Sequence, residues 1–339
     1  MTVQAKSRCA GILGLGAYVP PTIRTNADLE QSIDTTDEWI ISRTGIRERR
    51  IADPDGATSE LAFAAGATAL LDAEIDALDL DLIMVATCTP DHPGSFPSTA
   101  SIVQARLGAK NAAAFDLGAV CAGFSYALHV ASNLIVSGAN NRILVIGAEM
   151  LSRIVDWNDR NTAVLFGDGA GAAVVGLVPA GGYLGGILGA DGNGGPLLAV
   201  PSGGSRSPSD ASALCQNGSK IHQNGKEVYK FAVSVMGQAA LQAVESVGLT
   251  ANDIDCFIPH QANIRIIAKA AERMGLPMEK VFVNLDKYGN TSAASIPIAL
   301  DEAYRSGRLK PNDLVVLVGF GAGLTWGANV IRWTKAVPH

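Results

Sequence analysis

The chain has 339 residues, of which 48% are hydrophobic and 17% charged. This length exceeds what one minimal core needs, so we expect two domains or one large layered unit with the tightly packed interior of an α/β enzyme. The net charge of −6 argues against a general nucleic-acid surface, because such surfaces carry clustered positive charge. The five cysteines form no CxxC pair, which favours reduced thiols over a disulfide framework or a zinc site.

The first predicted element is a buried strand in the apolar run that begins at Cys9. Lys6 and Arg8 precede this run, as basic residues precede the apolar part of a signal peptide. Glycines break the run, however, and no clear small-residue cleavage site follows it. No stretch approaches the length of an uncharged membrane span. We therefore expect a cytoplasmic protein that is not bound to a membrane.

Two segments that begin at Asp79 and Asp253 follow the same pattern. Each predicts a strand, a helix that ends in a glycine turn, a short strand, an Ala-rich helix, and an apolar strand that closes on glycine. Corresponding landmarks lie about 167 to 174 residues apart, which indicates one folding unit used twice. Alternating strands and helices predict right-handed crossovers and mainly parallel sheets. The expected halves are residues 1–178 and 179–339.

Cys121 lies in "DLGAVCAGFSYAL", between a predicted strand and a predicted helix. From Phe124 onward the apolar residues follow helical spacing, so Cys121 is expected at or near a helix N-terminus. Unpaired N–H groups and the positive end of the helix dipole favour a thiolate there. Cysteine 121 is therefore a candidate nucleophile. The remaining cysteines lack such a setting and are expected to be inert: Cys9, Cys88, Cys215 and Cys256.

His260, in "IPHQAN", and Asn290, in "YGNTSAAS", are weaker signals when taken alone, since each could be a turn or cap residue. In the duplicated pattern, however, Asn290 follows a predicted strand ending at Leu285, much as Cys121 follows one ending at Leu117. A pseudo-twofold axis would bring both turns to one central seam, together with His260. The same residue order occurs in papain-like peptidases, but Cys121 lacks their C-G-S-C-W sequence and the chain is internally duplicated.

The glycine-rich segments 166–171 and 319–327 do not predict a nucleotide site. Neither has the Walker spacing with its lysine, or a G-x-G-x-x-G sequence that opens a helix. Residues 319–323 instead suit a loop that directs backbone N–H groups into the seam, as an oxyanion site requires.

Several motifs together resemble the β-ketoacyl-acyl-carrier-protein synthase III family, the initiating condensing enzymes of the thiolase-like superfamily. The resemblance covers the chain from about Gly11 to Trp333. It rests on "DEWIISRTGIRERRIA", "VCAGFSYAL", "FGDGAGAAV", "PHQANIRI", "GNTSAASIPIALDEA" and "GFGAGLTWG". The implied fold is α/β and thiolase-like, with duplicated halves in a five-layered αβαβα arrangement and a homodimer. Elongating relatives place a second histidine where Asn290 stands, so the initiating type is favoured.

The resemblance implies a decarboxylating Claisen condensation between an acyl-CoA primer, acetyl-CoA or another short one, and malonyl-acyl-carrier protein. Cys121 would attack the acyl-CoA thioester, and His260 and Asn290 would hold the thioester oxygen of the malonyl group. Backbone N–H groups of Cys121 and Ala322 would receive the tetrahedral oxyanion. Loss of carbon dioxide creates the attacking carbanion, so no metal, no cofactor and no carboxylate base is expected.

Several residues are expected to handle the two carriers. Trp39 can stack on the adenine of CoA and Arg43 can meet its phosphate, and by resemblance Arg160 closes the other side of the base. Asn263 and Arg265 match pantetheine and phosphate-side contacts of the family. Independently of the family, one basic helix stripe suits docking of an acidic carrier protein, although it could equally be an ordinary polar face. It consists of Arg265, Lys269 and Arg273, and Glu272 departs from the doubly basic pair of some relatives.

Phe96 aligns with the residue that the family's dimer lends to the acyl pocket of its partner. The polar segment 202–225 is too long for a simple connector and is expected to form a flap beside the tunnel. Two other functions stay open. One is a secondary-metabolism, polyketide-type condensing enzyme with an unusual primer, and the other is a non-condensing acyl-CoA-binding protein, which would give no burst of CoA on mixing with acetyl-CoA.

Overall fold

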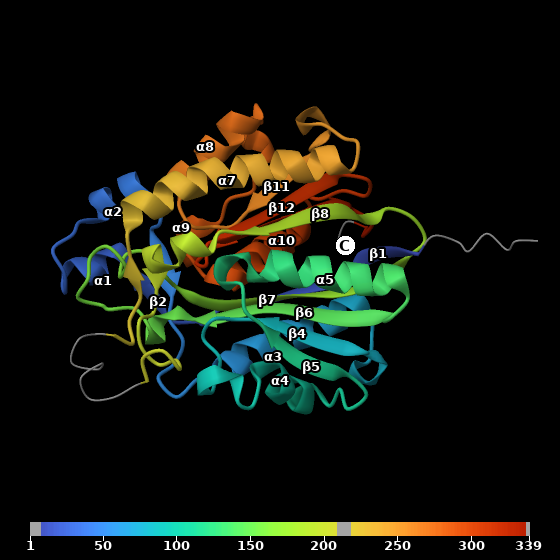
Figure 1. Cartoon of the computed structure of the whole chain (residues 1–339), viewed down its shortest axis with the longest axis horizontal. Helices are drawn as coiled ribbons and strands as arrows, with labels where there is room; N and C mark the ends of the chain where they lie inside the picture. Colours follow the sequence, from blue (N-terminus) through green and yellow to red (C-terminus); the bar gives the residue numbers. More distant parts are fainter. Residues whose placement is uncertain (1–7, 209–217, 337–339) are drawn as a thin grey trace, which may run out of the picture.

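The computed structural model describes residues 8–208 and 218–336, and its main strands form two sheets that lie one above the other (Figure 1). The five-stranded sheet contains, in spatial order, β1 (Cys9–Tyr18), β7 (Asp168–Val178), β6 (Arg142–Met150), β4 (Leu82–Ala86) and β5 (Ala113–Leu117). The four-stranded sheet contains β8 (Gly182–Ala190), β13 (Thr325–Arg332), β12 (Leu314–Gly321) and β11 (Cys256–Pro259). Two short pairs lie outside them, formed by β2 (Ile23–Thr25) with β3 (Glu48–Arg50) and by β9 (Leu198–Ala199) with β10 (His222–Gln223).

Helices cover the outer face of each sheet and fill the space between them, which gives five layers (Figure 1). The outer helices of the first sheet are α3 (Thr58–Ala73) and α4 (Thr99–Leu107), and those of the second are α7 (Gly225–Ser246) and α8 (Ile264–Met274). The central layer consists of α5 (Gly123–Ser137) and α10 (Ser295–Arg305). Three short helices lie at one end of the molecule: α1 (Asn26–Glu30), α2 (Asp37–Thr44) and α9 (Leu285–Tyr288).

The two sheets repeat one strand order, but they are mixed and not mainly parallel as expected. Strand β4 is parallel to β5 and β6, and β11 is parallel to β12, because a helix crosses over between these strands. The remaining pairs are antiparallel. In the second sheet the reason is local, since only three residues separate β12 from β13 and the chain must turn back on itself.

The second sheet also lacks a counterpart of β5. The sequence predicted a strand ending at Leu285, but among the described residues this segment makes only an isolated bridge between Phe257 and Val281. Leu285 itself begins the short helix α9, which turns the chain toward Asn290. The prediction of a complete second copy was therefore wrong at this strand, although the turn that follows it is present.

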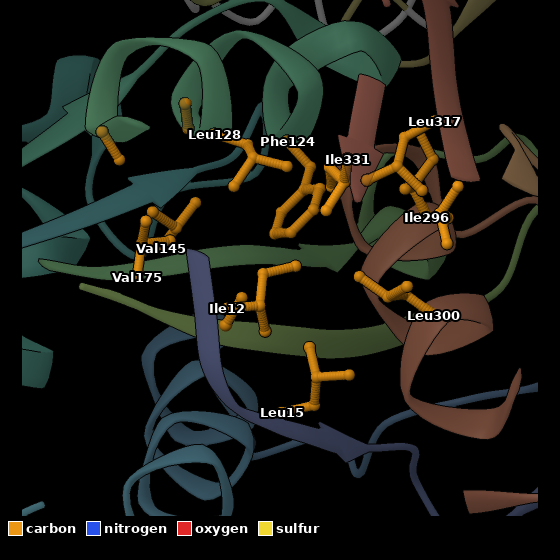
Figure 2. Packing of buried hydrophobic residues seen from close by; sticks show 14 of the residues in the cluster. Ile12, Leu15, Phe124, Leu128, Val145, Val175, Ile296, Leu300, Leu317 and Ile331 are labelled. Carbon is orange, nitrogen blue, oxygen red and sulfur yellow. The ribbon is translucent and has the colours of Figure 1, made fainter. Parts of the chain in front are cut away.

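Side chains from both sheets meet around the central helices in one large apolar cluster (Figure 2). Phe124 and Leu128 of α5 lie between Ile12 and Val175 of the first sheet and Ile331 of the second. Because side chains from both halves meet in this cluster, the two halves share one core. Each buried side chain of this size contributes roughly 1.5–3 kcal/mol to the stability of the fold. This shared core fixes the position of the turns at the start of α5 and α10 relative to each other.

Candidate active site

Cys121 lies in a one-turn helix, η3 (Val120–Ala122), which leads directly into α5 as expected. The turn is pressed against the end of β12. A Cβ atom added at Gly321 would lie 2.7 Å from the backbone nitrogen of Cys121, so only glycine permits this approach. The Cys121 side chain is buried but borders two cavities.

The charge state of Cys121 differs from the expectation. The pKa of the thiol is raised to about 12, chiefly by burial, although hydrogen bonds with Ser292 and with the backbone N–H of Cys121 act to lower it. The nearby Glu149 carboxylate raises it further. The prediction that the helix N-terminus would favour a thiolate is therefore wrong, because desolvation outweighs the favourable dipoles. The thiol must lose its proton during the reaction.

His260 follows directly after β11 and is buried beside Phe320, with the two rings edge to face. Burial lowers the pKa of its imidazole to about 3, so the ring is neutral near pH 7. Its Nδ1 atom lies 2.6 Å from the hydroxyl of Ser295, and this hydroxyl also accepts a bond from the Gln261 N–H. Ser295 can therefore donate its own hydrogen to Nδ1, which leaves the hydrogen of the neutral ring on Nε2.

Asn290 is held in the turn between α9 and the one-turn helix η8 (Ser292–Ala294). Its backbone bonds to Leu165 and Gly167, and its Oδ1 atom accepts the N–H of Ser292 at 2.8 Å. Among the residues that the structure describes, its Nδ2 group makes no hydrogen bond. The amide therefore offers a donor, and not an acceptor, to the seam.

The structure brings these three residues together. Cys121, His260 and Asn290 line one cavity of about 100 Å³, here called the seam cavity. Cys121 also lines a second cavity of about 250 Å³, here called the apolar cavity, which includes Ala322 as well. Its other walls are mainly aliphatic: Val120, Leu151, Ile154, Leu198, Val200 and Ile221. The expected loop at 319–323 is shorter than predicted, since β12 continues to Gly321 and Ala322 begins the turn.

Trp39, Arg43 and Arg160 form a cluster outside the seam cavity. The Arg160 guanidinium lies 4.5 Å from the centre of the Trp39 ring, and that of Arg43 lies 5.9 Å away. Asn263 joins this cluster to the cavity, because it lines the cavity and donates from Nδ2 to the Arg43 carbonyl at 3.0 Å. Its Oδ1 atom caps α8 by accepting the N–H of Arg265. Asn263 thus connects the Trp39 cluster to the cavity that Cys121 lines.

The basic stripe on α8 is less free than the sequence suggested. Arg265, Lys269 and Arg273 are all exposed, but Lys269 pairs with Glu272 at 2.6 Å. Arg273 donates to the carbonyl of Val233 at 2.7 Å, and Arg265 lies 5.7 Å from the ring centre of Tyr229. Within the described residues, Lys269 is therefore the one member of the stripe that has an ion-pair partner, and Arg265 and Arg273 have none.

Phe96 lines neither cavity, and 90% of its surface is exposed. The expected flap at 202–225 is described at both ends, whereas residues 209–217 lie outside the described residues. At its C-terminal end, Ile221 lines the apolar cavity and Gln223 lines the seam cavity. This part of the segment therefore borders both cavities.

Two residues beside Cys121 were not singled out from the sequence. Glu149 lies near the end of β6 and is fully buried, and Ser292 lies in η8 with its hydroxyl 3.0 Å from a Glu149 oxygen. The available signal was the acidic residue in the apolar strand "RILVIGAEM", because a carboxylate is seldom buried without a specific partner. By its pattern this stretch predicts only a strand, and Ser292 is predicted only as part of a helix cap.

Within residues 8–208 and 218–336, no group of three or more His, Cys, Asp or Glu side chains could hold a metal ion. One helical stretch, Val120–Ser137, has the length and composition of a membrane span, which the sequence reading had not expected. It comprises η3 and α5 and packs between the two sheets, so its apolar character is that of a core helix.

The sequence of the chain matches a known protein family. The family model "3-Oxoacyl-[acyl-carrier-protein (ACP)] synthase III" matches residues 115–192, and the model of its C-terminal part matches residues 244–333. The beta-ketoacyl-[acyl-carrier-protein] synthase III of Caldanaerobacter subterraneus subsp. tengcongensis is 58% identical over 327 residues, which cover 96% of this chain and 98% of the relative.

Two solved structures extend the comparison. The beta-ketoacyl-[acyl carrier protein] synthase III of Thermus thermophilus is 52% identical with a TM-score of 0.88, covering 96% of this chain and 100% of the other. The priming beta-ketosynthase of the R1128 polyketide pathway is 36% identical with a TM-score of 0.89, covering 100% of both chains. With such identity along almost its whole length, the chain belongs to the β-ketoacyl-acyl-carrier-protein synthase III family.

Proposed function

We propose that this chain condenses a short acyl-CoA primer, such as acetyl-CoA, with malonyl-acyl-carrier protein and so initiates fatty acid synthesis. The reaction is a decarboxylating Claisen condensation that yields 3-oxoacyl-acyl-carrier protein. The observation that carries the proposal is the shared cavity of Cys121, His260 and Asn290, which supplies a nucleophile and two neutral hydrogen-bond donors. Such a set suits acyl transfer followed by stabilisation of an enolate.

In the first half-reaction, the Cys121 sulfur attacks the thioester carbon of the acyl-CoA and CoA leaves. The N–H groups of Cys121 and Ala322 receive the tetrahedral oxyanion, and the aliphatic walls of the apolar cavity receive the acyl chain. Its position directly beside Cys121 supports this role, because an acyl group on the sulfur needs an adjoining apolar space. CoA would extend along Asn263 to Trp39, with Arg43, Arg160 and Arg265 near its phosphates.

In the second half-reaction, malonyl-acyl-carrier protein enters the emptied seam cavity. His260 donates from Nε2 and Asn290 from Nδ2 to the thioester oxygen, which gains negative charge as carbon dioxide leaves. The neutral state of His260 and the free amide of Asn290 support this assignment. The enolate then attacks the acyl-cysteine. The reaction needs no metal or prosthetic cofactor, because decarboxylation generates the nucleophile.

We also propose a cytoplasmic homodimer in which Phe96 of one copy closes the apolar cavity of the other. The exposure of Phe96 supports this arrangement, since a large aromatic side chain is seldom left almost fully in water without a partner. Arg265, Lys269 and Arg273 would face the acidic carrier protein at the mouth of the seam cavity.

Acetyl-CoA and intact-protein mass spectrometry test the nucleophile. The purified chain should release a burst of CoA and gain one acetyl group on Cys121, and C121A should do neither. An adduct that persists in C121A would refute the assignment. A chain that only binds acyl-CoA would give no burst.

The donors are tested separately from the nucleophile. In H260A and N290A, release of carbon dioxide from malonyl-acyl-carrier protein should fall by about 10²–10³-fold, since each variant removes an oxyanion donor. Acylation of Cys121 should be reduced less. If acylation collapsed as far as decarboxylation in both variants, the assigned roles would be wrong.

A polyketide-type priming enzyme is the second candidate, and the likeness to the R1128 priming ketosynthase favours keeping it. The two candidates share the chemistry and differ in the primer. A panel of primers from acetyl-CoA to decanoyl-CoA, straight and branched, distinguishes them by the mass added to Cys121. Preference for acetyl-CoA supports the first candidate, and preference for a longer or branched primer supports the second.

A further inference from the structure

Glu149 is a buried carboxylate that the condensation mechanism does not use. None of its surface is exposed, and it joins elements from both halves of the chain. From the segment after β4 it accepts hydrogen bonds from the hydroxyls of Thr87, at 3.2 Å, and Thr89, at 2.7 Å, and from the N–H of Cys88. From η8 it accepts the hydroxyl of Ser292 at 3.0 Å. A carboxylate with this many donors is held in one orientation.

Ser292 connects this carboxylate to the reacting sulfur. Its hydroxyl bonds to an oxygen of Glu149 and also lies within hydrogen-bonding reach of the Cys121 thiol. Thiol, hydroxyl and carboxylate thus form a chain in which each group can pass a hydrogen to the next. The titratable groups that face Glu149 in the described part of the molecule are Cys88, from the segment after β4, and Cys121, from η3.

Cys121 needs a proton acceptor, because burial keeps its thiol protonated near neutral pH. His260 is poorly suited to this task. Burial lowers the pKa of its imidazole to about 3, and Nδ1 is engaged by Ser295. Burial instead raises the pKa of Glu149 above its ordinary value, which makes this carboxylate a stronger base than an exposed one.

We propose that Glu149 is a positioning residue that takes up the Cys121 proton through the hydroxyl of Ser292 during acylation. This role rests on the proposed function. As the sulfur bonds to the thioester carbon, its S–H bond breaks and the proton passes to Ser292 Oγ, while the hydroxyl proton of Ser292 passes to Glu149. The CoA thiolate leaves and is protonated by solvent. When the condensation later expels the Cys121 thiolate, the same chain returns the proton.

A purely electrostatic role for Glu149 predicts the opposite effect of its removal. Its negative charge raises the pKa of Cys121, so a neutral residue at this position would increase the thiolate fraction. On that interpretation E149Q acylates faster than the wild type. If Glu149 accepts the proton, E149Q acylates more slowly, although glutamine can still accept the Ser292 hydrogen bond.

The experiment measures the single-turnover rate of acetyl transfer from acetyl-CoA to Cys121 between pH 6 and pH 9. We expect the rate of E149Q at pH 7 to fall by about 10²-fold and to rise with pH as the thiol ionises by itself. The wild-type rate should rise with pH less steeply than the rate of E149Q, and it should fall as acid protonates Glu149. An E149Q rate equal to or above that of the wild type would overturn the proposal.

Two further variants keep the test independent of folding. S292A leaves Glu149 in place and should slow acylation to a similar extent, and adding E149Q to it should give little further loss. D168N removes another fully buried carboxylate, one bonded to Ala52 and Ser152, and should acylate within about threefold of wild type. Losses in D168N as large as in E149Q, or additive losses in the double variant, would overturn the relay. Absence of an acetyl adduct in the wild type would instead overturn the proposed function.

Discussion

The turns that open the two central helices have the same backbone and different chemistry. Val120 begins η3 with a φ of 46° and Ser292 begins η8 with a φ of 48°, and both are non-glycine residues in the left-handed region. The next residue is Cys121 in the first turn and Ala293 in the second. The duplication therefore supplies two equivalent turns at the seam, and only one of them carries a nucleophile.

The strands that support these turns differ in a complementary way. Strand β6 passes η8 at Gly147, where an added Cβ would lie 2.2 Å from the Ala293 oxygen, and β12 passes η3 at Gly319, where it would lie 2.9 Å from Ala122 Cα. Two residues farther on, the first strand has Glu149 and the second has Gly321. The glycine leaves space for Cys121, whereas the glutamate fills the corresponding space near Ser292. The same backbone arrangement therefore holds a nucleophile, Cys121, at the first turn and a buried polar pair, Glu149 and Ser292, at the second.

Moving the thiol between the turns should have the largest effect. In C121A/A293C the acylation rate should fall by at least about 10⁴-fold, because Ala293 lines neither cavity and a thiol there would not face the seam cavity. Intact-protein mass after mixing with acetyl-CoA measures this. A293C alone should keep its adduct on Cys121, and an acetyl group found at position 293 would contradict the comparison.

Alanine substitutions at the two close glycine contacts should destabilise the folded chain to different extents. G147A should lower the free energy of unfolding by about 3 kcal/mol and G319A by about 1 kcal/mol, because the added methyl meets a backbone oxygen much more closely at the first site. Urea denaturation measures both. G118A is the matched control, since nothing lies within 4 Å of its added Cβ. A larger loss in G319A than in G147A would show that the first turn, not the second, is the tighter one.

The buried imidazole of His260 should make the free energy of unfolding sensitive to acid. Its pKa is lowered from 6.5 to about 3 in the folded chain, so the unfolded chain binds more protons in this interval. The stabilisation is present above pH 6.5 and is lost as the pH falls. Between pH 7 and pH 5 we expect the free energy of unfolding of the wild type to fall by about 2 kcal/mol, and that of H260Q not to show this fall. C121A should show the same fall in the free energy of unfolding as the wild type. An equal fall in H260Q would show that His260 is not its cause.

The smallest effect concerns carrier docking, which we assign to α8 and not to α4, the corresponding helix of the first half. R265E should raise the KM for malonyl-acyl-carrier protein by about threefold to tenfold, and K269E by less, because Glu272 already neutralises Lys269. Both effects should shrink at high salt. R106E on α4, where Arg106 pairs with Glu60, is the control and should leave the KM unchanged.

The sequence predicted the family, the fold class and the reaction type, and the comparisons confirmed all three. It also predicted that Cys121, His260 and Asn290 would meet, and they line one cavity. Their catalytic roles, the division at residue 178 and the homodimer stay predictions. The predicted strand ending at Leu285 was wrong because a short apolar run does not reveal whether a neighbouring strand is there to pair with it.

The sequence alone determined the repeat and the turns, because glycine spacing, helical periodicity and the succession of strands and helices along the chain depend on residues that are close in sequence. Only the tertiary structure decided the electrostatics of the seam. The pKa of Cys121 depends on how completely the second half covers it, and the path from Cys121 to Glu149 exists because Ser292, from the other half, lies between them. Desolvation and contacts between distant segments are set by the packed fold, so no local pattern in the chain could reveal them.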